Sequence, residues 1–235
     1  MLIGGDGLAR LAAARVAIFG AGAVGAFAIE ALARSGVGYL RIVDFDEVRV
    51  SNMNRQLLAL RSTVGCAKAA LAAARVRDIN PAAAVDARTM FFAGPAEETL
   101  LDGGLDYVID AIDSMNPKVS LICAARSRGL KVISSMGAAG RTDPTRVRVT
   151  DLDEVVGCSL SKVVRKKIRR RGVRDGVDAV WTTERMARRL MAPPSPEASV
   201  ARGRERAQLP SAVFVPAAFG IAAAHHVVRH ILEKR

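Results

Sequence analysis

Two cationic side chains and one carboxylate have the types and the order needed for chemistry on a phosphate. Arg55 and Lys68 lie within one short stretch, and Asp113 ends a later apolar run. Adenylyl transfer builds negative charge on the α-phosphate oxygens and on the departing pyrophosphate, and an Arg fork, a Lys point charge and Mg²⁺ stabilise such charge. A dehydrogenase grips its dinucleotide mostly through backbone and gains little from two such cations. We therefore predict that ATP is cleaved, not merely held.

Each of these side chains also has an ordinary alternative. We predict that Arg55 and Lys68 are catalytic groups at the triphosphate, although solvated surface charges would be the default for such residues anywhere else in the chain. We predict that Asp113 is the metal ligand for Mg²⁺, which nucleotide sites hold through one or two carboxylates together with phosphate oxygens. The alternative for Asp113 is an N-cap for a helix that begins ahead of Pro117.

The nucleotide is expected at a glycine-rich turn. An apolar run over residues 15–19 is followed by the sequence GAGAVG over residues 20–25 and then by a helical pattern. Gly20 permits the tight turn, Gly22 lets backbone N–H groups approach a phosphate, and Gly25 lets helix and strand pack closely. The phosphate would lie at the positive N-terminus of the helix. The alternative is a glycine turn without a ligand.

A second carboxylate is placed to hold a ribose. Asp44 follows the apolar run 39–43 and lies 19 residues after Gly25, a spacing that suits hydrogen bonds from the two ribose hydroxyls of NAD, FAD or ATP alike. In a doubly wound sheet, ligands bind beyond the carboxyl ends of the strands. Asp44 and Asp113 are therefore expected to face one crevice.

These groups require a scaffold of alternating strands and helices. The pattern predicts an α/β fold, a Rossmann-like doubly wound and mostly parallel sheet with helices on both faces and a basic C-terminal segment. Residues 146–150 alternate like an edge or antiparallel strand. Residues 212–228 are mostly apolar but short for a membrane span, so we expect a buried C-terminal helix that could lie at a dimer interface, and no membrane association.

Length and composition indicate one domain over residues 1–235. A chain of 235 residues with 50% hydrophobic content can bury one sizeable core. We divide it into a nucleotide-binding core over 1–150, a basic segment over 151–208 and a C-terminal helix over 209–235. A Pro-rich loop near 190–208 is expected to be mobile.

The last third of the chain is strongly basic. The net charge is +12, and residues 151–235 carry 17 Lys and Arg against 9 Asp and Glu. A helical run contributes Lys162, Arg165, Lys166, Lys167, Arg169, Arg170, Arg171 and Arg174, and the loop near 193–196 is flanked by Arg185, Arg188, Arg189, Arg202, Arg204 and Arg206. A surface that binds nucleic-acid phosphates and a solvated helix face both explain the run, and the size of the charge favours the phosphate-binding surface.

The three cysteines exclude some classes of protein. Cys66, Cys123 and Cys158 are scattered, so the sequence has neither a Cys-x-x-Cys zinc pair nor a disulfide framework. Cys158 could be an acyl-accepting thiol, but a packed or surface thiol is the simpler interpretation. With no secretory signal at the N-terminus, we expect the protein in the reducing cytoplasm.

Several segments together resemble the ubiquitin-activating, ThiF and MoeB superfamily of ATP-dependent adenylating enzymes. They are DFD at residues 44–46, SNMNRQ at 51–56, TVGCAK at 63–68, INP at 79–81 and DAIDS at 110–114. Within that superfamily the chain is most similar to the tRNA threonylcarbamoyladenosine dehydratase group. That similarity is carried by residues 2–4, 140–145, 147–152, 181–184 and 214–220, so it spans nearly the whole chain.

The resemblance implies an activity and a set of site residues. Such enzymes adenylylate the carboxylate of threonylcarbamoyladenosine beside the anticodon of tRNA, and the activated acyl group cyclises with loss of AMP. Asp44 would hold the ribose, the backbone of Gly22 and Ala23 would face the phosphates, and Asp113 would bind Mg²⁺. The nucleotide-binding set carried over by position is Gly20, Gly22, Ala23, Gly25, Asp44, Ser51, Asn52, Asn54, Arg55, Gln56, Lys68, Asp113 and Ser114.

The chain departs from the group in two places. Ala23 stands where relatives often have Gly, a small change because only the backbone N–H is needed. Relatives also carry an Arg just upstream of the segment Leu2 to Gly4 that reaches ATP from the partner subunit of a homodimer. The printed chain begins at Met1, after that position, so either the start lies further upstream or the site has one cation fewer.

Two other functions fit parts of the sequence. One is an adenylyltransferase that activates a ubiquitin-like sulfur carrier protein, with that carrier or a sulfur-relay protein as partner. The other is a non-catalytic nucleotide-binding or RNA-binding module. The missing zinc cysteines and the basic last third favour the tRNA enzyme over the first, and Arg55, Lys68 and Asp113 together disfavour the second.

Overall fold

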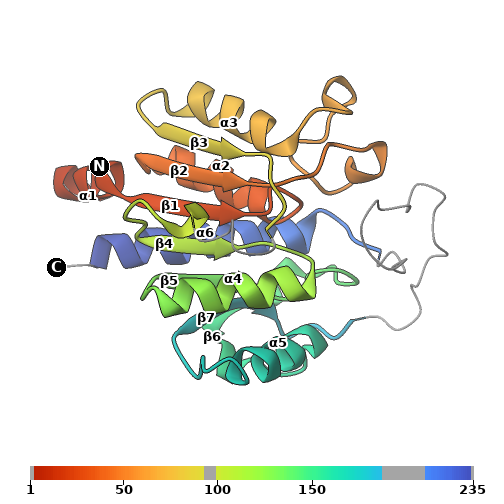
Figure 1. Cartoon of the computed structure of the whole chain (residues 1–235). Coiled ribbons are helices and arrows are strands. Elements are labelled where there is room, and N and C mark those ends of the chain that lie inside the picture. The colour runs from red at the N-terminus through yellow and green to blue at the C-terminus, as the bar shows by residue number, and fades with distance from the viewer. Residues whose placement is uncertain (1–2, 93–98, 187–209, 234–235) are drawn as a thin grey trace.

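A computed structural model describes residues 3–92, 99–186 and 210–233 of the chain. Within them a seven-stranded sheet has the order β3-β2-β1-β4-β5-β7-β6 (Figure 1). The strands are β1 (Arg15–Phe19), β2 (Tyr39–Val43), β3 (Ala84–Arg88), β4 (Tyr107–Asp110), β5 (Lys131–Ser135), β6 (Val147–Asp151) and β7 (Val177–Thr182). The helices are α1 (Gly4–Ala13), α2 (Gly25–Arg34), α3 (Lys68–Ile79), α4 (Met115–Ser127), α5 (Ser159–Arg169) and α6 (Phe214–Glu233).

The strand directions confirm the predicted fold class. β1 pairs in parallel with β2 and β4, and β3, β5 and β7 extend the parallel sheet on either side. β6 pairs antiparallel to β7 at the sheet edge, as the alternation over residues 146–150 predicts. Phe19 is level with both Val43 and Asp110, so the carboxyl ends of β1, β2 and β4 meet at one edge of the sheet. The candidate site residues gather at this edge.

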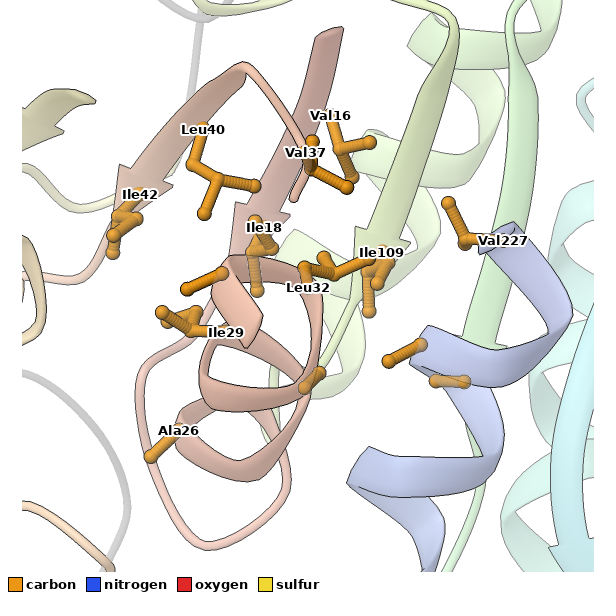
Figure 2. Packing of buried hydrophobic residues seen from close by; sticks show 14 of the residues in the cluster. Val16, Ile18, Ala26, Ile29, Leu32, Val37, Leu40, Ile42, Ile109 and Val227 are labelled. Carbon is orange, nitrogen blue, oxygen red and sulfur yellow. The ribbon is translucent and has the colours of Figure 1, made fainter. Parts of the chain in front are cut away.

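Helices cover both faces of the sheet, and each face has its own apolar core. Alternate strand residues point to opposite faces, so Ile18 belongs to one core and its neighbour Phe19 to the other. Figure 2 shows Ile18 beside Leu32 of α2, with Val227 of α6 in the same core. Helices α4 and α5 supply the core on the opposite face. Full burial of each such side chain contributes about 1.5–3 kcal/mol.

The expected buried C-terminal helix is α6, which lies against α2 behind the sheet (Figure 1). Its contact with α2 depends on Gly220, because a Cβ there would stand 2.3 Å from the Val24 carbonyl oxygen and 2.9 Å from the Ala28 nitrogen. A side chain at this position would force the two helices apart. Among the described residues, no helix is long and apolar enough to cross a membrane.

The basic helix is shorter than the run 162–174 suggests. α5 ends at Arg169 because the chain turns at Gly172, whose φ is +86°. The Val173 nitrogen donates to the Ile168 carbonyl and the Gly172 nitrogen donates to the Arg169 carbonyl, which is the Schellman pattern of a helix C-terminus. The predicted loop at 190–208, and Arg188, Arg189, Arg202, Arg204 and Arg206 with it, lie outside the described residues.

Candidate active site

The glycine turn joins β1 to α2 with almost no space to spare. Gly20 has φ +95°, and a Cβ there would lie 2.7 Å from the Ala111 carbonyl oxygen. A Cβ on Gly25 would lie 1.7 Å from the Gly20 carbonyl oxygen, so only glycine lets α2 begin this close to the strand. Gly22 differs, since its nearest neighbour would be the Gln56 amide nitrogen at 3.9 Å. The turn is therefore rigid at both ends and open in its middle, where a phosphate would approach the backbone.

Asp44 shapes this turn from the end of β2. Its Oδ2 accepts a hydrogen bond from the Ala21 nitrogen at 2.6 Å, and its Oδ1 accepts one from the Asp46 nitrogen at 2.8 Å. Burial raises the pKa of the Asp44 carboxyl, although the nearby Lys68 charge opposes that shift. Each carboxylate oxygen accepts more than one hydrogen bond, so acceptor capacity remains for ribose hydroxyls. Its contact with the glycine turn is a structural role that spacing alone did not reveal.

Lys68 is held under the site by an ion pair that the sequence analysis missed. The residue is 4% exposed at the start of α3. Its Nζ lies 3.1 Å from the Asp46 Oδ2, and its backbone nitrogen donates to the Asp46 carbonyl. The available signal was the carboxylate of Asp46 two residues after Asp44. A buried lysine with one partly exposed carboxylate partner retains donors for an anionic ligand.

Arg55 and Asp113 influence each other electrostatically across the site. Burial lowers the pKa of the Arg55 guanidinium, and the negative charge of Asp113 opposes that shift. One end of the guanidinium is fixed, because Nη1 donates to the Ser51 carbonyl at 2.8 Å and to the Asn54 Oδ1 at 2.9 Å. The fold thus brings together two groups that are 58 positions apart in the chain.

The N-cap alternative for Asp113 is not what the structure has. α4 begins at Met115 and its N-cap is Ser114, so Asp113 precedes the cap. The Asp113 carboxylate is exposed at the site edge and accepts a hydrogen bond from the Ser114 hydroxyl at 3.2 Å. It is consequently available to a ligand.

The other side chains of the segment 51–56 differ in their burial and in their hydrogen bonds. Asn52 is buried and its Oδ1 accepts a hydrogen bond from the Arg49 nitrogen, while the Asn54 amide donates to the Ser211 carbonyl ahead of α6. Gln56 lies beside Gly22, and its Oε1 is buried without a hydrogen-bond partner among the described residues. An unpaired buried acceptor costs about 1–3 kcal/mol, which a ligand donor at the glycine turn would relieve.

The carboxylates fit a magnesium ion that comes with a triphosphate, and do not fit a metal held by protein alone. Among the described residues there is no group of three or more His, Cys, Asp or Glu side chains that could hold a metal ion. A structural zinc site needs four such ligands, whereas Mg²⁺ commonly takes one or two carboxylates and completes its shell with phosphate oxygens and water. The exposed Asp113 carboxylate suits the second case.

Fold and site together define a nucleotide-binding α/β enzyme of the adenylating type. The chain belongs to the ThiF family, whose profile matches residues 1–235. It is 42% identical over 241 residues to the tRNA threonylcarbamoyladenosine dehydratase of Bacillus subtilis, covering 99% of this chain and 92% of the relative. The enzyme of that name from Escherichia coli is 35% identical over 250 residues, with 99% and 91% coverage. The resemblance found in the sequence is confirmed.

Solved structures show the same similarity in three dimensions. The crystal structure of the E. coli enzyme TcdA in complex with ATP superposes with a TM-score of 0.85 at 35% identity, covering 99% of this chain and 91% of that one. The AMP complex of the same enzyme gives a TM-score of 0.86 at 36% identity, with 99% and 92% coverage.

Proposed function

We propose that this chain catalyses the ATP-dependent dehydration of threonylcarbamoyladenosine in tRNA by adenylylating its carboxylate. The observation that carries the proposal is that Arg55 interacts with the charge of Asp113, and Lys68 with that of Asp44, around an open glycine turn at the carboxyl edge of the sheet. Two cationic side chains, together with a carboxylate that can bind Mg²⁺, stabilise the negative charge that develops when a nucleophile attacks an α-phosphate. The similarity to dehydratases over nearly the whole chain supports tRNA as the acceptor.

The reaction has two steps in which atoms balance. A carboxylate oxygen of the substrate attacks the α-phosphorus of ATP, the bond to the bridging oxygen breaks, and pyrophosphate leaves with that electron pair. A nucleophile within the same substrate then attacks the acyl carbon of the adenylate, loses its proton, and releases AMP. Overall the substrate loses the elements of one water, because one carboxylate oxygen leaves on AMP and the hydrogens leave as protons.

The side chains act mainly by electrostatics. Arg55 offers its unfixed guanidinium donors to the phosphate oxygens, and Lys68 exchanges part of its contact with Asp46 for the triphosphate. These groups are held in place before the reaction, so charge that develops in the transition state is met without reorganisation. Asp113 would hold Mg²⁺, which supplies further neutralisation of the leaving pyrophosphate when bound. Asp44 and Gln56 would accept hydrogen bonds from the nucleoside.

The tRNA surface is narrower than the whole basic run. Four cations of the run are used within the protein: Arg165 donates to the Leu152 and Asp153 carbonyls, Arg169 pairs with Asp153, Lys167 binds Asn116, and Arg171 binds Ser120. Lys162, Lys166 and Arg170 are exposed, and no side-chain hydrogen bond or ion pair to any described residue is found for them. Spaced four residues apart, they form one line along the helical surface, which we call the phosphate row.

The phosphate row leads toward the active site. Lys167 of α5 donates a hydrogen bond to Asn116, and Arg171 just after α5 donates one to Ser120 further along α4, so α5 runs in the same direction as α4. α4 begins beside Asp113, and the N-terminal end of α5 with Lys162 is therefore at the active-site edge of the sheet. We propose that tRNA phosphates follow this row while the modified nucleoside enters the site.

We also propose that the enzyme is a cytoplasmic homodimer. Val50, Leu60 and Val64 lie between β2 and α3 with 60%, 57% and 42% of their surface exposed, and apolar side chains gathered in one such segment are typical of an interface. The three cysteines are free, which fits a reducing compartment. Light scattering of the purified protein tests the dimer.

The carrier-protein alternative is less well supported. A thiol that accepts an acyl group must be reachable, but Cys158 is buried at the N-cap of α5 with its Sγ close to Gly137. The experiment that separates the functions measures AMP formation from ATP with two acceptors, threonylcarbamoyladenosine-bearing tRNA and a carrier protein ending in Gly-Gly. The proposal expects AMP only with the tRNA. AMP only with the carrier would support the alternative.

A further inference from the structure

A lysine and an aspartate are completely buried next to the active site, and the proposed reaction does not use them. Lys118 of α4 and Asp110 at the end of β4 both have side chains with 0% exposure. The Lys118 Nζ donates to the Asp110 Oδ2 at 2.7 Å, to the Ser135 carbonyl at 3.0 Å and to the Ser134 Oγ at 3.3 Å. Every donor of the ammonium group has a partner in the protein, so Lys118 has none left for a substrate.

This cluster is an inefficient way to gain stability. Removing two charges from water costs several kcal/mol for each ion, and apolar side chains of similar volume often give a protein that is as stable or more stable. An ion pair with 0% exposure is therefore expected to have a role other than stabilising the fold. That role follows from the hydrogen bond accepted by the second carboxylate oxygen of Asp110, Oδ1.

Asp110 connects the buried lysine to the turn that carries Asp113. Its Oδ1 accepts a hydrogen bond from the Ile112 nitrogen at 3.1 Å, and its Oδ2 accepts a second bond from the Ser134 hydroxyl at 2.6 Å. Ile112 is directly followed by Asp113. The cluster thus fixes the turn after β4 to β5 on one side and to α4 on the other.

The same turn also touches the other half of the site. The Ala111 nitrogen donates to the Phe19 carbonyl at 2.8 Å, and the Ala111 carbonyl oxygen packs against Gly20, where a Cβ would be only 2.7 Å away. A shift of this turn would therefore move Asp113 and disturb the glycine turn together. Misplacement of a reacting group by about 1 Å can cost on the order of 10²-fold in rate.

We infer that Lys118 is a positioning residue which, through Asp110, holds the Ala111–Asp113 turn so that the Asp113 carboxylate meets Arg55 and the metal-bound triphosphate. The inference rests on the proposed role of Asp113 and goes beyond it, because Lys118 touches neither ATP nor metal. Ser134, as a second donor to Asp110, supports the same turn to a smaller degree.

The test compares three variants of the full chain by three measurements. Lys118→Met removes the cation at similar length, and Ser134→Ala removes one donor while the ion pair stays. Tyr107→Phe is the matched control, because Tyr107 is at the first residue of β4 and its hydroxyl donates to Asp178 at 2.6 Å, at the opposite end of the same strand. The measurements are the thermal unfolding midpoint, the affinity for a non-hydrolysable ATP analogue with and without Mg²⁺, and the turnover of AMP formation.

A positioning role predicts that metal-free nucleotide affinity stays near wild type in the Lys118 and Ser134 variants while the gain in affinity from Mg²⁺ becomes smaller. We expect Lys118→Met to lower that gain and the turnover by about tenfold or more, and Ser134→Ala to lower them a few-fold. Tyr107→Phe should lose stability but keep both values. Should Lys118→Met fail to fold, Ser134→Ala decides alone.

Two results overturn the inference, and they are distinguishable. Variants that lose only stability, with a wild-type Mg²⁺ gain and wild-type turnover per folded molecule, would make the cluster purely structural and leave the proposed function intact. A wild-type protein in which Mg²⁺ brings no gain in affinity would remove the metal role of Asp113, and this inference with it.

Discussion

The ammonium group of Lys68 lies 3.1 Å from the Asp46 carboxylate while the Lys68 side chain is only 5% exposed. A cation at the first turn of a helix opposes the helix macrodipole, and burial adds a desolvation cost. Asp46 offsets both, but it remains 43% exposed and so stabilises the pair only partly. Lys68 is thus a costly cation for the fold, which supports the phosphate-binding role that we propose for it.

The first prediction follows from this placement. Lys68→Met should change the stability only slightly, because removal of an unfavourably placed cation offsets the loss of its attraction to the buried Asp44 carboxylate. Turnover of AMP formation should fall by about 10²-fold, because a phosphate-binding charge is removed. Lys131→Met, which changes an exposed lysine at the start of β5, is the control and should alter neither. Thermal unfolding and steady-state kinetics measure both effects, and a strongly destabilised but fully active Lys68→Met protein would refute the assignment.

Arg55 is predicted to act on the transition state more than on bound ATP. Arg55→Ala should depress turnover by on the order of 10²-fold while the affinity for ATP changes less. Arg55→Lys should also be impaired, because a point charge cannot both hold the Ser51 carbonyl and present a planar fork to the phosphates. Near-normal turnover of Arg55→Ala would remove Arg55 from the catalytic set.

Loss of the Asp113 carboxylate should abolish adenylate formation without unfolding the protein. Asp113 is exposed and precedes the α4 N-cap, so Asp113→Asn removes little that the fold needs. Asp175→Asn, at another exposed position, is the control. Activity is measured over a series of Mg²⁺ concentrations, and an Asp113→Asn enzyme with full activity at all of them would exclude the metal role.

The phosphate row is tested by the salt dependence of tRNA binding. Replacing Lys166 and Arg170 with Ala should weaken binding and reduce the slope of log affinity against log salt by about 0.7 to 0.9 for each phosphate that the protein no longer neutralises. The control replaces Arg77 and Lys131 with Ala, which removes the same charge from exposed positions on other elements and should leave the slope unchanged. Equal slopes for both double variants would make the row an ordinary solvated face. The affinity for ATP should equal that of the wild type in both double variants.

The cations of the basic run differ in ways that their sequence does not show. Arg169, Arg170 and Arg171 are adjacent in the sequence and look equivalent, but Arg169 pairs with Asp153 and Arg171 binds Ser120. Substituting Arg169 or Arg171 would loosen α5 and confuse structural with binding effects. Only the three-dimensional contacts separate the cations that hold α5 from those that face solvent.

What could be predicted from sequence depends on how local the cause is. Gly20 and Gly25 are required by steric contacts within one turn, and β6 follows from its own alternation, so both could be read from short segments. The Lys68–Asp46 pair depends on a bridge between Glu47 and Ala67, which joins the loop after β2 to the start of α3. The buried Lys118–Asp110 pair depends on how α4 packs over β4 and β5. Lys118 shows no sign of burial in its own segment, where Asn116 and Pro117 suggest a surface turn.

The central claim is tested most directly by following nucleotide and tRNA together. The purified protein is incubated with Mg²⁺, ATP and tRNA that carries threonylcarbamoyladenosine, or with the same tRNA without the modification. We predict one AMP and one pyrophosphate for each modified nucleoside that loses the mass of one water, and no AMP with unmodified tRNA. Conversion of ATP to ADP, or equal AMP formation with both tRNAs, would contradict adenylylation of the modified nucleoside.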